Sequence, residues 1–188
     1  MFRSEDGSNP IGNVLRAIQN CAKPVIARIN GSALAGGFGL VAACDLAYAA
    51  DHARFGLPEV RVGVFPMMIA TRLVHQVPER RLRELAYLGD TVGALDAMQW
   101  NIVNRVAPAA ELDGLIDDAL AKLMLAAPDA LAMGKKALFD IPELGREEAL
   151  VYAERAIGML GESAEAAEGR AAFAEKRKPR WAVVSSDS

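Results

Sequence analysis

The chain has 188 residues, enough for one domain with an appendage and for a core that buries roughly 70% of the unfolded chain's surface. Its 52% hydrophobic and 24% charged residues exclude a disordered chain, and its net charge of −3 provides no basic field for nucleic acid. Two cysteines and two histidines supply neither a disulfide framework nor a rich metal site. Because no apolar run approaches the ~18 residues of a membrane span and no apolar signal core follows Met1, we expect a cytoplasmic protein without a membrane partner.

The first part of the chain alternates between helix and strand patterns. Asn9-Pro10 is typical of an N-cap followed by a first-turn proline, and the apolar spacing behind it predicts a helix over residues 10–20. Residues 25–29 are β-branched and predict a strand. The small residues from 31 onward predict a loop that enters a tightly packed helix ending near Cys44, and a short strand is expected at 45–49.

The remainder is mainly helical. The segments 55–59 and 63–66 are expected as loops, and one last strand is expected at 102–106. The first nine residues are expected to be loose and the tail from Trp181 to be disordered. We place a boundary near residue 108, between a strand-containing part (1–108) and a helical part (109–188). Helices are predicted at 67–77, 78–88, 94–100, 111–126, 129–139 and 143–177, the last with breaks near Gly158 and Gly161.

The glycine-rich stretch invites two nucleotide-binding interpretations, and both fail. Gly31 and Gly36 fit the first half of a Walker A loop, but Gly37 and Phe38 stand where that loop needs lysine and a hydroxyl residue. Residues 37–42 satisfy the dinucleotide fingerprint G-x-G-x-x-A, and Glu59 follows about 20 residues after Gly39, where the fingerprint expects an acid. Other glycines separate this fingerprint from the preceding strand, however, and the acid follows a proline in a loop. A nucleotide-dependent oxidoreductase is therefore disfavoured.

Two interpretations of the same glycines stay open. A glycine N–H at a helix N-terminus can donate to an enolate or tetrahedral oxyanion, because the helix dipole favours negative charge there. Alternatively, the small residues only permit close helix packing. From the residues alone, the oxyanion-donor and the packing interpretations are equally well supported.

Two charged features also allow a functional and a structural interpretation. Glu59 stands between Pro58 and Val60 in a mostly apolar stretch, where desolvation would raise its pKa toward the range of a general base. A glutamate in a loop is more commonly solvated or ion-paired. The basic run over residues 176–180 fits a solvated helix end, or contact with an anionic ligand such as a phosphate.

Several segments together resemble the crotonase (enoyl-CoA hydratase/isomerase) family, in order and spacing, from about residue 10 to residue 181. The resemblance implies an α/β fold: a spiral of β-β-α units, here incomplete at the N-terminus, with a helical C-terminal region that forms trimers or hexamers. It implies an acyl-CoA thioester as ligand, with coenzyme A as part of the substrate and with no separate cofactor or metal. The segments are 23–40 (KPVIARINGSALAGGFGL), 43–46 (ACDL), 55–60 (FGLPEV), 63–66 (GVFP), 88–90 (LGD), 101–106 (NIVNRV) and 173–179 (FAEKRKP).

The resemblance also implies residue roles. It places one of two backbone donors to a thioester enolate at the N–H of Gly36 and a general acid/base at Glu59. The residues that it places along the acyl-CoA near the thioester are Leu34, Gly37, Pro58 and Met67, with Phe65 and Met68 close by.

This sequence departs from the family pattern at Gly39. Hydratases of the family usually carry a second glutamate at this position, three residues after the oxyanion glycine. Hydration adds a hydroxide and a proton, a task that two carboxylates share, whereas one carboxylate can carry a proton between two carbons. The glycine therefore favours double-bond isomerisation, or a variant hydratase.

A second departure concerns the other oxyanion donor. Family chains supply it from an N-terminal half, in a segment of the F-x-A-G-x-D-L type, and the 188 residues contain no such segment. We therefore expect a fragment of a longer enzyme or a shortened member. The alternative is a catalytically silent crotonase-fold protein that acts as an oligomeric or regulatory subunit.

Overall fold

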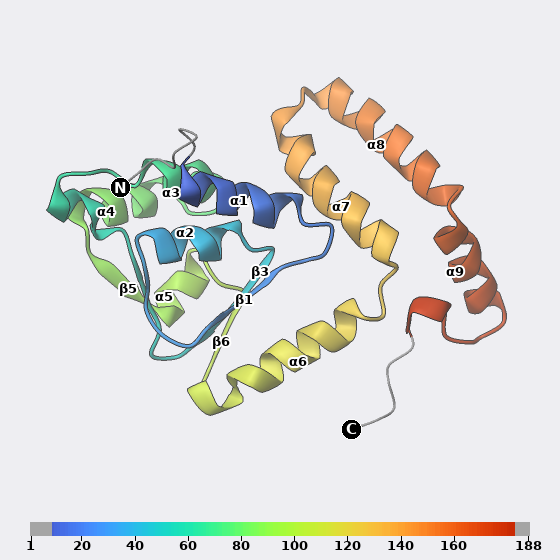
Figure 1. Cartoon of the computed structure of the whole chain (residues 1–188), viewed down its shortest axis with the longest axis horizontal. Helices are drawn as coiled ribbons and strands as arrows, with labels where there is room; N and C mark the ends of the chain where they lie inside the picture. The colour runs from blue at the N-terminus through green and yellow to red at the C-terminus, as the bar shows by residue number, and fades with distance from the viewer. Residues whose placement is uncertain (1–8, 183–188) are drawn as a thin grey trace. The chain divides into compact units, whose positions relative to one another are not determined.

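The computed structural model describes residues 9–182, which form two compact units. The first comprises the chain up to Asn20 together with Val25–Ile116, and the second comprises Cys21–Pro24 and the chain from Asp117 onward. Figure 1 shows the elements of each. The expectations of a loose start and a disordered tail fall largely outside the described residues; within them, the 3₁₀ helix η4 (Arg180–Ala182) includes Trp181.

Two small sheets organise the first unit. One is parallel, in the order β1-β3-β6, and the other has the order β2-β4-β5, with β4 parallel to β2 and antiparallel to β5. The pairs β1–β2 and β3–β4 each place one strand in each sheet before a helical segment, as expected for β-β-α units. The strands are β1 (Ile26–Ile29), β2 (Ala33–Leu34), β3 (Leu46–Ala50), β4 (Arg54–Gly56), β5 (Thr91–Gly93) and β6 (Arg105–Ala107).

Helices cover these sheets. As expected, Asn9 caps the first of them, because its side-chain oxygen accepts the N–H of Gly12 at 3.1 Å. Helices α1 and α3 both pack against α2 (Figure 1). The helical elements of this unit are α1 (Pro10–Asn20), α2 (Gly36–Ala43), η1 (Pro58–Val62), α3 (Met67–Leu73), α4 (Glu79–Leu88), α5 (Ala94–Gln99) and η2 (Ala109–Glu111).

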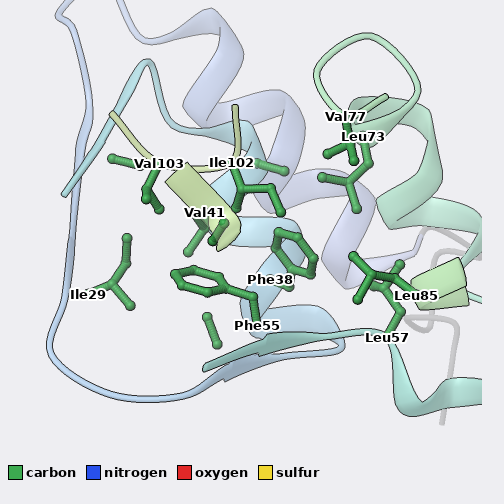
Figure 2. Close-up of a cluster of buried hydrophobic side chains, with 14 of the residues drawn as sticks. Ile29, Phe38, Val41, Phe55, Leu57, Leu73, Val77, Leu85, Ile102 and Val103 are labelled. Carbon is green, nitrogen blue, oxygen red and sulfur yellow. The ribbon is translucent and has the colours of Figure 1, made fainter. Parts of the chain in front are cut away.

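The core connects α2 to β4. Phe38 of α2 and Phe55 of β4 are fully buried, and their rings meet edge to face with centroids 5.8 Å apart (Figure 2). Behind them, Gly56 lets β4 approach β5, since a Cβ there would lie 2.7 Å from the carbonyl oxygen of Asp90. These contacts hold the beginning of α2 beside the segment that follows β4, which carries Glu59.

Three sequence expectations for this unit are wrong. The last strand, expected at 102–106, begins only at Arg105 (β6), because Ile102 and Val103 pack into the core ahead of it. The expected loop 55–59 contains part of β4 and the start of η1. Helix α3 ends at Leu73, and turns over residues 74–76 replace the expected last helical turn before Pro78.

The second unit is helical. Helices α7 and α8 lie side by side in a hairpin (Figure 1), and the expected helix break occurs after Gly161, whereas α8 continues through Gly158. Ser163 then caps the next helix by accepting the N–H of Ala166. Among residues 9–182, no helix has the length and apolarity to cross a membrane. The elements are α6 (Leu112–Leu123), which begins in the first unit, α7 (Pro128–Asp140), η3 (Ile141–Glu143), α8 (Arg146–Gly161) and α9 (Ala164–Ala174).

Candidate active site

The first turn of α2 begins with the backbone N–H of Gly36, for which the described part of the chain offers no acceptor. The residue before it, Ala35, has φ 48° and is held there by two hydrogen bonds, from its N–H to Gly56 O (3.0 Å) and from Gly39 N–H to its carbonyl (3.1 Å). An alanine side chain cannot cap a helix, and no described residue accepts the N–H of Gly36. The helix dipole adds partial positive charge at this end, so the site is suited to an oxyanion.

Glu59 lies in η1, just after the buried Leu57. Its Oε2 atom is buried and has no hydrogen-bond partner among the described residues. Desolvation raises the pKa of the carboxyl, opposed by a smaller effect from its own backbone N–H. A carboxyl whose pKa is raised by desolvation accepts a proton more readily than a solvated one, which suits a general acid/base.

Both features border one apolar cavity of about 550 Å³. The structure brings five of the predicted site residues into its lining: Gly36, Glu59, Phe65, Met67 and Met68. Three others, Leu34, Gly37 and Pro58, are each adjacent in the chain to a lining residue but do not line the cavity themselves.

Sequence reasoning missed six of the lining residues. Ile11 and Ile69 carried only the signal of core positions in helices, and Asn9 only that of a cap. No signal in the sequence distinguishes Ala35, whose positive φ is unusual for an alanine. The complete lining is Asn9, Ile11, Ala35, Gly36, Glu59, Val64, Phe65, Pro66, Met67, Met68 and Ile69.

At residue 39, where hydratases of the family usually carry a second glutamate, the neighbouring helix packs closely. Gly39 is buried within α2 and faces Ile69 of α3. Among the described residues, no group of three or more His, Cys, Asp or Glu side chains is placed to hold a metal ion.

A family model described as enoyl-CoA hydratase/isomerase matches residues 4–183. The chain belongs to this family. Curated relatives include the carnitinyl-CoA dehydratase of Escherichia coli K12, 38% identical over 172 residues, which are 89% of this chain and 66% of the relative. A putative enoyl-CoA hydratase of Thermus thermophilus is 36% identical over 85% of this chain and 63% of its own length. The chain thus spans slightly less than two thirds of these relatives.

Solved structures of the enoyl-CoA hydratase/isomerase family agree with the fold. An enoyl-CoA hydratase of Mycobacterium smegmatis superposes with a TM-score of 0.87 at 36% identity, covering 91% of this chain and 66% of that one. Human enoyl-CoA hydratase domain-containing protein 3 gives 0.86 at 30% identity, with 91% and 68% covered. The expected crotonase-like fold is confirmed.

Proposed function

We propose that the cavity binds the acyl part of an acyl-CoA thioester, and that Glu59 moves a proton on it while the N–H of Gly36 stabilises the enolate. One observation carries the proposal: Oε2 of Glu59 and the N–H of Gly36, neither of which has a hydrogen-bond partner within residues 9–182, border the same apolar cavity. Burying an unpaired carboxyl lowers stability, so this arrangement is expected where the carboxyl has chemistry to perform.

The proton transfer needs one carboxylate only. With a 3-enoyl-CoA, ionised Glu59 removes a proton from the carbon between the thioester and the double bond. The C–H electron pair moves into the thioester, and the resulting enolate oxygen accepts the N–H of Gly36. Protonated Glu59 then returns the proton to the far carbon of the original double bond, which leaves a conjugated 2-enoyl-CoA and a carboxylate ready for the next cycle.

We infer that isomerisation is faster than hydration. Hydration requires a water to be activated as well as a proton delivered, and residue 39, a glycine packed against Ile69, offers no carboxylate for the first task. The names of the relatives, a dehydratase and a putative hydratase, favour the opposite preference. The ratio of the isomerisation rate to the hydration rate therefore shows which of the two reactions the protein prefers.

The experiment measures both activities of the full chain on matched 3-enoyl-CoA and 2-enoyl-CoA thioesters. Glu59→Gln should reduce kcat about 10²–10⁴-fold with little change in KM, because the amide is nearly isosteric but cannot carry the proton. Glu111→Gln, at an exposed position of η2, is the matched control. Fast hydration without isomerisation would contradict the one-carboxylate argument. A folded chain that binds acyl-CoA but turns over neither thioester would favour the catalytically silent subunit.

A further inference from the structure

The cavity wall has almost no polar side chain. Of the described residues that line it, only Glu59 is ionisable and only Asn9 carries an amide, whose oxygen already accepts the N–H of Gly12. An acyl group bearing a carboxylate would lose its hydration there and meet a carboxylate of the same sign. The lining therefore fits an uncharged aliphatic acyl group.

Part of this wall depends on a contact between α1 and α3. Met68 lines the cavity, and its terminal methyl rests against the backbone of Gly12. A Cβ built on Gly12 would lie 2.9 Å from the methyl carbon of Met68, closer than nonbonded carbon atoms pack. The absence of a side chain at residue 12, which we call the Gly12 recess, is thus what accommodates the methionine.

Glycine at this position is otherwise unfavourable. Residue 12 is in the first turn of α1 and is buried, and alanine stabilises helices relative to glycine. Methionine has three rotatable bonds, so its methyl can leave the recess without a shift of either helix. Because Met68 lines the cavity, a methyl group displaced from the recess can enter the cavity.

We propose that Met68, seated in the Gly12 recess, sets the depth of the cavity and hence the length of the aliphatic acyl chain that it accepts. This inference rests on the proposed function, since it names the acyl groups that the same site takes. It assigns a specificity-determining role to Met68 and Gly12, with no part in the proton transfer.

The test measures the Kd of saturated straight-chain acyl-CoAs, from butanoyl-CoA to dodecanoyl-CoA, by isothermal titration calorimetry of the full chain. Saturated chains bind without reacting, so the measurement is independent of turnover. Each methylene that enters the cavity should lower Kd about fourfold, until the chain end reaches Met68 and the series levels off. The length at which it levels off is the measured quantity.

Variants should move that length in opposite directions. Gly12→Ala should shorten it by roughly one or two methylenes, because the new methyl group displaces that of Met68 into the cavity. Met68→Ala should lengthen it by roughly two methylenes, and the double variant should match Met68→Ala because no methyl is left to displace. The controls are Gly114→Ala, whose new Cβ would have no atom within 4 Å, and Met124→Ala, at a residue 55% exposed.

If Kd stops falling at the same acyl-chain length in the wild type and in the variants, this inference is overturned and the proposed function still stands. Failure of the wild type to bind any of these thioesters would overturn both. If circular dichroism shows that Gly12→Ala does not fold, Met68→Ala decides alone, and an unchanged length in that variant overturns the inference.

Discussion

A Cβ atom built on Gly39 of α2 would lie 3.0 Å from Cγ1 of Ile69 in α3. Ile69 is 3% exposed and lines the cavity, so the two helices approach closely at the site itself because residue 39 has no side chain. The position where hydratases of the family usually carry a glutamate is therefore filled by an isoleucine from the neighbouring helix. A change at residue 39 has to be judged together with Ile69.

Gly39→Glu alone should lower the free energy of unfolding by about 1–3 kcal/mol, because it overpacks the contact with Ile69, and it should not raise the hydration rate. Combined with Ile69→Ala, the loss should be smaller than the sum of the two single losses by about 0.5–3 kcal/mol. Urea unfolding of the four proteins measures this cycle. Strictly additive losses would show that the two positions do not compete for the same space.

Gly36→Val should strongly weaken acyl-CoA binding and leave the fold intact. A Cβ at residue 36 would contact only Cδ1 of Ile11, at an ordinary 3.8 Å, so the backbone has room for a side chain that would then project beside the N–H donor. Acyl-CoA affinity should fall more than tenfold, about 1.4 kcal/mol, and Gly36→Ala should show a smaller loss. Unchanged affinity in the valine variant, with native circular dichroism, would mean that this glycine serves packing alone.

The carboxyl of Glu59 should make stability depend on pH. Burial raises its pKa in the folded chain above the ordinary 4.5, so the folded state holds this proton more tightly than the unfolded state. Stability from this group is present below pH 4.5 and is lost as the pH rises through the folded pKa. Glu59→Gln should therefore raise Tm at pH 7 and leave it unchanged at pH 4, as calorimetry can show; a lower Tm at pH 7 would indicate that the carboxylate has a stabilising partner.

Glu168 should contribute stability of the opposite pH dependence in the second unit. Its carboxylate accepts from Arg177 (Nη1, 2.6 Å) and from the backbone N–H of Arg180 (3.0 Å). These contacts, that with Arg177 above all, lower its pKa to about 2. This contribution is present above pH 4.5 and is lost as the pH falls toward 2. Glu168→Gln should lower Tm at pH 7 and match wild type near pH 2, with Glu154→Gln as an exposed control. If Glu168→Gln has the same Tm as the wild type at both pH values, the ion pair contributes nothing to stability.

This arrangement also bears on the basic run at residues 176–180. Two of its cations, Arg177 and Arg180, form ion pairs with Glu168 within the second unit. The run therefore has an internal structural role, which neither a solvated helix end nor an anion-binding segment would require.

The helices of the second unit should associate with further copies of the chain. They expose large apolar side chains, including Leu138 (80% exposed), Ile157 (67%) and Phe173 (87%), and exposed apolar surface of this kind marks interfaces. We expect a trimer or hexamer by light scattering, weakened by Ile157→Glu or Phe173→Glu. A stable monomer at micromolar concentration would contradict this.

Local interactions explain what could be predicted from sequence. The Asn9 cap, strand β1 and the break after Gly161 depend on residues within a few positions of one another, so the chain itself carries their signals. The candidate donor at Gly36 and the acid at Glu59 were recognised because short motifs around them resemble those of the family.

Distant contacts explain the rest. Strands β2, β4 and β5 have two or three residues each, too few to show a period of two, and they exist because their hydrogen-bond partners lie elsewhere in the chain. The cavity arises in the same way, since Ile11, Met68 and Ile69 become its walls only when α1 and α3 pack on α2. The sequence by itself determined which residues could carry the chemistry, because it contains residue type and local spacing. Tertiary packing decided the burial of Glu59 and the space next to Gly36, because both depend on which segments fold over these residues.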